Sequence, residues 1–359
     1  MLALNARRWS AMRTAFGLLV SGLVVLSTGS ASVAEDDAAL LKQAQGIFRP
    51  LPKNMATAEF PVTPDRVALG QQLFFDPRLS VDSTTSCMRC HQPALYGTDG
   101  LAKSHGNHDK LNGHNAPTVL NTAVQFVAHW IGDRKNIEDQ AMRSLLGPAS
   151  MGNPDYGAAM AKIKAIPAYP AMFRKAFPNE PDPVTPENFG KALGAYERTL
   201  VTPSRFDDYL GGKVEALSPR ERAGLRKFIA TGCTACHDGV GIGGGMFRKF
   251  GVVMDYWTQT GSKDVDKGRF DATHDPADMY VFRVASLRNV AMTSPYFHDG
   301  SVASLPDAVR IMAKVQIGVD LAEEDQRDIV AFLGSLTGPL PQGLTSSPVL
   351  PPAGFAGTN

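Results

Sequence analysis

Two five-residue stretches, Cys87-Met88-Arg89-Cys90-His91 and Cys233-Thr234-Ala235-Cys236-His237, decide the fold and contain all four cysteines of this chain. A Cys-x-x-Cys-His stretch is typical of haem c attachment, because two thiols add to the haem vinyl groups and the histidine then lies under the iron as its proximal ligand. A zinc site would need four ligands in a tighter cluster, and a redox dithiol needs no adjacent histidine. The sequence therefore predicts two covalently bound haems c, held by Cys87, Cys90, Cys233 and Cys236, with His91 and His237 as iron ligands.

The first 34 residues have the layout of a cleavable signal peptide. Three arginines, at positions 7, 8 and 13, precede an apolar stretch from 15 to 26, and Ser32-Val33-Ala34 is a small-residue cleavage site. An uncleaved membrane anchor is the alternative, but the apolar stretch is short and interrupted. We therefore expect cleavage after Ala34 and export to the periplasm.

The charge of the chain is nearly balanced. Loss of the three signal-peptide arginines turns 36 basic and 35 acidic residues into 33 and 35, and haem propionates add further negative charge. A nucleic-acid partner would call for a clustered basic face. The balance argues against nucleic acid and favours a redox protein or a small oxidant as the partner.

Helix signals recur along the chain, whereas no run of alternating apolar and polar residues is long enough for a major sheet. Thr63-Pro64, Thr185-Pro186 and Ser218-Pro219 each place a capping hydroxyl before a proline at the first helical position. Apolar residues at helical spacing in 189–200 and 329–336 should face inward. We predict an all-α fold with little β structure, in which helices at 64–75 and 219–229 precede the two haem motifs.

The chain is long enough for two domains, since about 325 mature residues exceed the usual size of a single core. We predict two cytochrome c-like haem domains, an N-terminal one at 35–204 and a C-terminal one at 205–337. Residues 201–218 read as the linker between them, and the Pro- and Gly-rich segment 338–359 as an irregular tail. The glycine-rich stretch 239–251 is expected to be a loop on the second haem.

The ligand opposite each proximal histidine separates electron transfer from catalysis. A haem with two protein ligands suits electron transfer, and one with a vacant or displaceable position can react with peroxide or oxygen. Spacing alone does not choose among six further histidines and the methionines, and a methionine in a helical pattern is more often a core residue. The histidines are His105, His108, His114, His129, His274 and His298.

Five further stretches make the chain resemble bacterial dihaem cytochrome c peroxidases, a family related to the dihaem enzyme that matures tryptophan tryptophylquinone. They are LGQQLFFDPRLS at 69–80, NAPTVLN at 115–121, IPAYPAMFRKAFP at 166–178, YVFRVASLRNVAMTSPYFHDG at 280–300 and AVRIM at 308–312. The resemblance covers nearly the whole mature chain. It implies a peroxidatic N-terminal haem that reduces hydrogen peroxide, a C-terminal haem that stores electrons from a small cytochrome c or cupredoxin, and, as is common in the family, a homodimer.

The resemblance also implies roles for single residues. Met312 matches the methionine ligand of the second haem, Trp130 the tryptophan between the haems, and Gln140 a glutamine of the peroxide pocket. His298 matches a position near the second haem. The ligands of an inter-domain calcium ion are matched by Asn115, Thr293 and Pro295. Oxygen ligands suit calcium, but without a carboxylate the site should bind weakly or serve structure.

Two departures from the family pattern fall in the peroxidatic pocket. The displaceable distal histidine corresponds to Asn107, although His105 and His108 flank it and either could bind iron after a small loop shift. The glutamate that moves protons on peroxide corresponds to Ser150, and serine is a poor base near neutral pH. His105, His108, His114 or an ordered water held by Gln140 and Ser150 would have to replace it. Equally, these histidines could belong to an exposed polar loop.

The departures leave two enzymatic functions in competition. In the first, a periplasmic peroxidase reduces hydrogen peroxide at the His91 haem with electrons passed through the Met312 haem and Trp130. In the second, a dihaem oxidase modifies a partner protein through a high-valent haem state. The missing glutamate favours the second function, whereas Met312 does not, because the maturation enzyme carries a tyrosine there. An electron carrier without catalysis would need both irons firmly six-coordinate.

Overall fold

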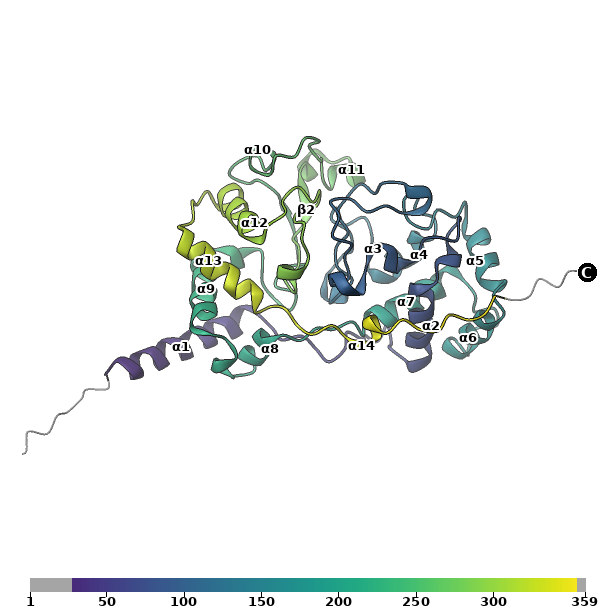
Figure 1. Ribbon diagram of the computed structural model, residues 1–359, viewed down its shortest axis with the longest axis horizontal. Helices are drawn as coiled ribbons and strands as arrows, with labels where there is room; N and C mark the ends of the chain where they lie inside the picture. The colour runs from purple at the N-terminus through teal and green to yellow at the C-terminus, as the bar shows by residue number, and fades with distance from the viewer. Residues whose placement is uncertain (1–27, 354–359) are drawn as a thin grey trace, which may run out of the picture.

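The computed structural model describes residues 28–353, in which helices form two lobes that lie side by side (Figure 1). Most of the predicted signal peptide, residues 1–27, lies outside this range. The first lobe contains α2 (Pro64–Phe75), α3 (Cys87–Cys90), α4 (Ile137–Ser144), α5 (Tyr156–Lys164), α6 (Ala168–Ala176) and α7 (Pro186–Glu197). The second contains α8 (Arg205–Leu210), α9 (Pro219–Ala230), α10 (Trp257–Thr260), α11 (Phe270–Thr273), α12 (Leu305–Met312) and α13 (Glu323–Gly334).

The predicted helix starts are confirmed. The hydroxyls of Thr63, Thr185 and Ser218 each accept a hydrogen bond from a backbone N–H in the first turn, and the proline after each opens α2, α7 and α9. The predicted apolar faces are buried, with Leu193 and Leu336 fully enclosed. The only sheet in residues 28–353 pairs β1 (Phe247–Lys249) with β2 (Val281–Arg283) antiparallel, so the all-α prediction is confirmed.

Both lobes have the same central contact, in which a glycine lets two helix backbones touch. A Cβ atom at Gly70 of α2 would lie 2.0 Å from the carbonyl oxygen of Ala192 in α7. A Cβ atom at Gly224 of α9 would lie 1.8 Å from that of Asp328 in α13. In each lobe, the helix before the Cys-x-x-Cys-His motif is thereby packed against the last long helix of the lobe, so the two lobes repeat the same arrangement.

The two ends of the described chain each pack on the lobe that is distant in sequence. Helix α1 (Thr28–Ile47) contributes Leu40 and Ala44 to the core of the second lobe, and Phe48 directly after the helix joins them. The C-terminal segment crosses to the first lobe, where Leu344 is buried in its core (Figure 1). The predicted domain boundaries at 204 and 337 stay predictions. They did not include the packing of each chain end on the lobe that is distant in sequence.

Three segments predicted to be irregular contain short regular elements. Helix α8 lies within the predicted linker 201–218, β1 lies within the glycine-rich stretch, and α14 (Gln342–Thr345) lies within the tail. Helix α14 is held from the first lobe, because the side chains of Gln71 and Tyr196 both donate hydrogen bonds to the carbonyl of Gly343. Such short elements depend on tertiary contacts, which explains why local signals did not predict them.

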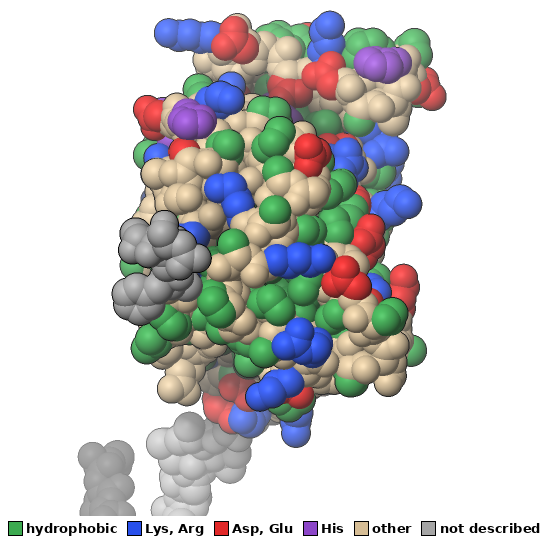
Figure 2. Space-filling view, turned by 90° about the vertical axis from the view of Figure 1, so that its right-hand side faces the viewer, with side chains coloured by type: hydrophobic (Ala, Val, Ile, Leu, Met, Phe, Trp, Pro, Cys, Tyr) green, Lys and Arg blue, Asp and Glu red, His purple; other side chains and the backbone are tan. Residues whose placement is uncertain are grey.

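The outer end of the first lobe carries charges of both signs interspersed with apolar side chains (Figure 2). Among the helices of residues 28–353, none is long and apolar enough to cross a membrane.

Candidate functional site

The two motif histidines are held in the same way. The Nδ1 atom of His91 lies 3.0 Å from the carbonyl oxygen of Gly97, and that of His237 lies 3.3 Å from the carbonyl oxygen of Ile242. A carbonyl can only accept, so Nδ1 carries the proton and Nε2 keeps its lone pair. Burial lowers the pKa of both rings, which keeps them neutral near pH 7. Both histidines therefore suit an iron ligand.

The motif cysteines lie beside these histidines and are half-buried. Burial raises the pKa of the Cys87 and Cys90 thiols, and it raises the pKa of Cys233 to about 11. Cys87 packs against the core of the first lobe and Cys233 against that of the second. Paired thiols next to a neutral imidazole fit a haem attached in each lobe, with His91 and His237 under the irons.

Asn107, at the position of the expected distal histidine, is buried and joins two loops by hydrogen bonds, an arrangement called the Asn107 clamp below. Its side-chain amide donates to the carbonyls of Pro148, at 2.8 Å, and Ser150, at 2.9 Å, and its backbone N–H also donates to Ser150. Glycines allow the close approach, since a Cβ atom at Gly106 would lie 2.0 Å from the carbonyl of Ala149. The loop around Asn107 is thereby joined to the segment that carries Ser150.

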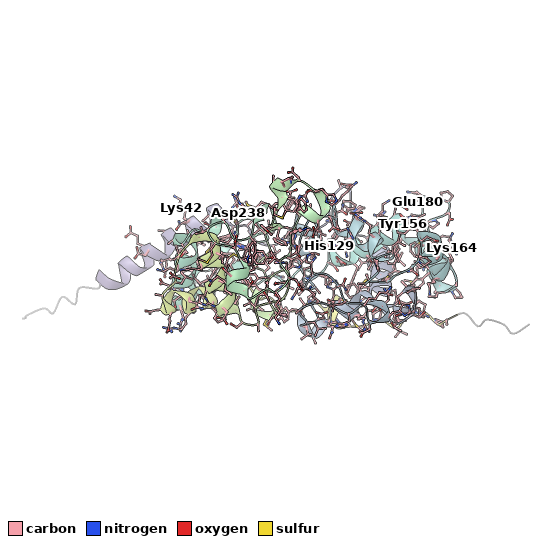
Figure 3. All side chains as sticks on the ribbon, turned by 90° about the horizontal axis from the view of Figure 1, so that it is seen from above. Lys42, His129, Tyr156, Lys164, Glu180 and Asp238 are labelled. Carbon is pink, nitrogen blue, oxygen red and sulfur yellow. The ribbon has the colours of Figure 1, made fainter. Side chains whose placement is uncertain are left out.

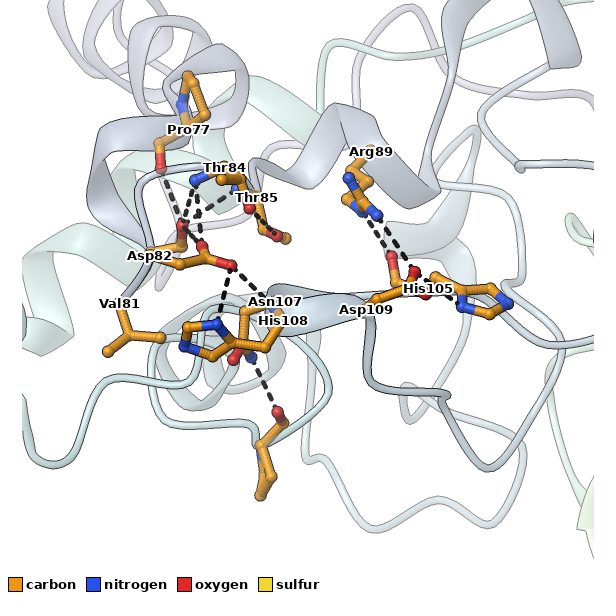
Figure 4. Close-up of polar contacts among 12 residues, drawn as sticks. Pro77, Val81, Asp82, Thr84, Thr85, Arg89, His105, Asn107, His108 and Asp109 are labelled. Atoms are coloured by element: carbon orange, nitrogen blue, oxygen red, sulfur yellow. Dashed lines mark hydrogen bonds and ion pairs between the residues drawn. The ribbon is translucent and has the colours of Figure 1, made fainter.

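The two histidines beside Asn107 lie in surface ion pairs (Figure 4). The Nδ1 atom of His105 is 3.0 Å from a carboxylate oxygen of Asp109, and 42% of the His105 side chain is exposed. His108 is 60% exposed and turns toward Asp82, which also accepts its backbone N–H at 2.8 Å. Arg89, inside the first haem motif, donates to the carbonyl of His105 at 2.6 Å. Iron ligation by either ring would require these contacts to break.

Gln140 and Ser150 are the remaining predicted pocket residues. Gln140 lies on α4, and its Oε1 atom is enclosed without a hydrogen-bond partner in residues 28–353. Ser150 uses its backbone for the clamp described above. Enclosed polar atoms are normally paired, so Gln140 is suited to hold a polar molecule that enters the pocket.

A half-buried carboxyl that the sequence did not indicate lies near Cys87. Glu197 ends α7, and burial together with the negative charge of Glu138 raises its pKa to about 8. Its charge in turn contributes to the raised pKa of Cys87. No sequence signal marks Glu197, because its burial depends on how α7 packs.

Trp130 lies where the two lobes meet. Its indole Nε1 donates to the carbonyl of Asn115 at 2.9 Å, and its ring meets the edge of His298 at 6.4 Å between centroids. His298 is 2% exposed and stacks on Phe282 at 4.2 Å, and burial lowers its pKa to about 4. Figure 3 shows His129, the residue before Trp130, near the middle of the molecule. The predicted place of Trp130 between the two haems stays a prediction.

Met312 ends α12 at a half-buried position, beside a buried cluster that includes Phe250 and Tyr256. A one-turn π-helix at Ala313–Ile317 follows it directly. Such local widening of a helix often occurs at functional sites. Ligation of the second haem by Met312 remains a prediction.

Two of the three predicted calcium ligands, Asn115 and Pro295, are in contact between the lobes. The side-chain amide of Asn115 lies 3.1 Å from the carbonyl oxygen of Pro295, and Thr293 lies two residues before this proline. No cluster of three or more His, Cys, Asp or Glu side chains that could hold a metal occurs in residues 28–353. An amide and backbone carbonyls are instead the oxygen donors that a hard cation accepts.

A helical protein with two such histidine–cysteine sites is a dihaem cytochrome, and comparison with known proteins identifies the family. Residues 64–215 match the family model of the di-haem cytochrome c peroxidases. The chain is 40% identical over 336 residues to the cytochrome c551 peroxidase of Pseudomonas aeruginosa, covering 93% of this chain and 95% of that one. It therefore belongs to the di-haem cytochrome c peroxidase family, a family of oxidoreductases whose members carry two haems.

The chain is also similar to MauG and to a MauG-like protein. It is 32% identical over 322 residues to the methylamine utilization protein MauG of Methylorubrum extorquens, covering 86% of this chain and 88% of that protein. Among solved structures, it resembles a MauG-like protein associated with microbial copper homeostasis. The TM-score is 0.70 at 27% identity, with 83% of this chain and 95% of the other covered.

Proposed function

We propose that this protein is a periplasmic peroxidase that reduces hydrogen peroxide to water with electrons from a small cytochrome c or cupredoxin. The carrying observation is the clamp at Asn107, which commits the side chain at the distal position to two backbone carbonyls. A neutral His91 under the iron and no committed ligand opposite it would leave room for peroxide. The identity to a cytochrome c551 peroxidase over nearly the whole chain supports the substrate.

Haems attached through Cys87, Cys90, Cys233 and Cys236 would supply the redox chemistry, with His91 and His237 as the residues that hold their irons. Residues 35–204 are proposed to hold the peroxidatic haem and residues 205–337 the electron-transfer haem, with Met312 as its sixth ligand and 338–359 as a tail. Trp130 is in contact with residues of both lobes, which supports a place for it between the two haems. An aromatic ring there is suited to relay single electrons between them.

Proton movement has to be carried by residues other than a pocket glutamate, since Ser150 replaces it. Gln140, whose Oε1 is unpaired in the described chain, can orient peroxide or a water molecule. The imidazoles of His105 and His108 are 42% and 60% exposed, so they can exchange protons with solvent and, through water, with the pocket. We therefore assign positioning to Gln140 and proton exchange to the two histidines.

A calcium ion at the lobe interface would be held by Asn115, Thr293 and Pro295. Amide N and O are interchangeable by a flip, which would place Oδ1 of Asn115 about 3.1 Å from the Pro295 carbonyl oxygen. That separation suits two oxygens that bind one cation at roughly 2.4 Å each. The ion would join the lobe of Trp130 to the lobe of His298.

We further propose that the protein forms a homodimer and that residues 1–34 are a signal peptide.

A second candidate function is a dihaem oxidase that modifies residues of a partner protein. Ser150 at the glutamate position favours it, as do the similarities to MauG and to a MauG-like protein. Met312 opposes it, because a methionine at the second iron suits a plain electron store.

Steady-state peroxide consumption with a reduced small cytochrome tests the proposal. We expect measurable turnover in the parent protein and faster turnover in Ser150→Glu, because general acid–base catalysis typically contributes about 10²-fold or more. Negligible turnover in the parent together with recovery in the variant would favour the oxidase instead. Spectra add a second test: an open first haem is high-spin in the fully oxidised protein, whereas a spin change only on half-reduction would mean that His105 or His108 binds the iron.

A further inference from the structure

Three arginines are deeply buried in the described chain, and one of them has no acidic partner. Arg198 and Arg288 each form an ion pair at 2.8 Å, with Glu138 and Asp207 respectively. Arg283 is 4% exposed, and no carboxylate of residues 28–353 forms an ion pair with it. It is thus unlike the other two buried arginines.

The contacts of Arg283 are all with uncharged oxygens. Its Nε donates to the carbonyl of His129 at 3.0 Å, and its Nη1 donates to the side chain of Gln125 and to the carbonyl of Val284. Its backbone N–H donates to the carbonyl of Trp130 at 2.8 Å. Nη2 has no acceptor among residues 28–353, so one arm of the guanidinium is available to a further group.

A buried cation without a counter-ion is costly. The effective penalty for taking one ion out of water is several kcal/mol even after relaxation. Burial lowers the pKa of Arg283 only to about 10, so the guanidinium stays charged at neutral pH. An anion that residues 28–353 do not provide is therefore needed at this place.

The position of Arg283 indicates which anion this is. Residues alternate in direction along β2, so that Phe282 stacks on His298 while Arg283 turns to Gln125. The chain after β2 runs along the loop behind the second motif: Gly244 donates to the carbonyl of Val284 at 2.9 Å. A Cβ atom at Gly243 in that loop would lie 2.2 Å from the carbonyl of Ala285 and 3.0 Å from Nδ1 of His237.

We propose that Arg283 is the counter-ion of a haem propionate, and that the propionate belongs to the second haem. This inference rests on the proposed attachment of a haem at Cys233 and Cys236. A haem carries two carboxylates that its protein must accommodate, and a guanidinium binds a carboxylate through two parallel hydrogen bonds. Arg283 is a positioning residue, since it acts on the iron through the propionate.

Two consequences follow from this pairing. A positive charge beside the propionate favours the reduced iron, which carries one positive charge fewer, and so it raises the reduction potential of the second haem. Since Arg283 also bonds the carbonyls of His129 and Trp130, it connects this haem to the segment that carries the relay tryptophan.

A spectroscopic redox titration of the holoprotein tests the inference without reference to peroxide. We expect Arg283→Gln to lower the ratio of reduced to oxidised second haem about tenfold at a fixed potential, equal to about 59 mV for one electron. Arg283→Lys keeps the charge and should lose less. Lys249→Gln removes an exposed charge from the same small sheet and should change the ratio little, because solvent screens it.

Each outcome decides the matter. An unchanged second haem in Arg283→Gln would overturn the inference, and a shift confined to the first haem would overturn the assignment to the second. The propionate bending band in resonance Raman spectra gives an independent readout. It should shift in Arg283→Gln and in Arg283→Lys. Covalent haem content is measured first: a protein that attaches fewer than two haems contradicts the proposed function and not the role of Arg283.

Discussion

Substitution of Gly224 by alanine tests the shared helix contact of the two lobes. The added Cβ would lie 1.8 Å from the carbonyl oxygen of Asp328 and 2.9 Å from Cβ of Phe332, whereas ordinary contact begins at 3.4 Å. The obstacle is backbone, which no side-chain rotation relieves. Helices α9 and α13 would therefore have to separate by roughly 1.6 Å at this point.

The cost follows from the side chains that this contact holds together. Leu225 and Phe228 of α9 are buried against Ile329 and Phe332 of α13, and each buried side chain contributes about 2 kcal/mol. A gap of about 1 Å forfeits a quarter to a half of each contact, which amounts to roughly 3 kcal/mol for the four. Alanine recovers about 1 kcal/mol of helix propensity, leaving a net loss of about 2 kcal/mol.

Thermal unfolding of the holoprotein, followed by far-ultraviolet circular dichroism, measures this loss. For a lobe of about 150 residues, a net loss of about 2 kcal/mol lowers the midpoint by about 4–8 °C. Gly334→Ala, in α13 itself, is the matched control, because no atom lies within 4 Å of its added Cβ. A Gly224→Ala protein that unfolds at the same temperature as this control would refute the close helix contact.

Three further predictions concern the haem sites. Met312→Ala should lower the potential of the second haem in a redox titration, whereas the control Met292→Ala, at a 46% exposed position, should not; an unchanged potential would remove Met312 from the ligands. Burial and the charge of Glu138 raise the pKa of Glu197 to about 8, so the protonated form stabilises the fold. This stabilisation is complete below about pH 4.5 and is lost as the pH rises through 8. In urea unfolding, the free energy of unfolding of the parent should fall between pH 4.5 and 8, and that of Glu197→Gln should fall less. An equal fall in both proteins would contradict the raised pKa of Glu197. Asn107→Ala removes two donated hydrogen bonds and should cost about 2 kcal/mol in the same assay, a value that a merely exposed loop would not give.

Local signals predicted those parts of the molecule that depend on neighbours in sequence. The starts of α2, α7 and α9 are confirmed at the expected residues, because a capping hydroxyl and a proline act within one turn. The two haem motifs likewise bring thiols and imidazole together within five residues. Helices α8 and α14 were missed, since a helix of four to six residues is stable only through what it packs against.

The distal side of the first haem site could not be read from spacing. Alignment placed an asparagine at the histidine position, but it did not reveal that Asn107 is held by carbonyls from 41 and 43 residues away. Nor did it reveal that His105 and His108 turn toward Asp109 and Asp82. The direction of a side chain in a loop depends on which distant groups it can reach, and this is known only after the chain has folded.

The number of haems, their predicted proximal ligands and the helical class can therefore be read from the sequence, because they rest on covalent and one-turn geometry. The pairing of charges is a property of the tertiary structure. Arg288 and Arg283 lie five residues apart in sequence. Arg288 forms an ion pair with Asp207, whereas within residues 28–353 the side chain of Arg283 donates only to neutral oxygens. Electrostatic energy depends on distance through space and on burial, and neither can be counted along the chain.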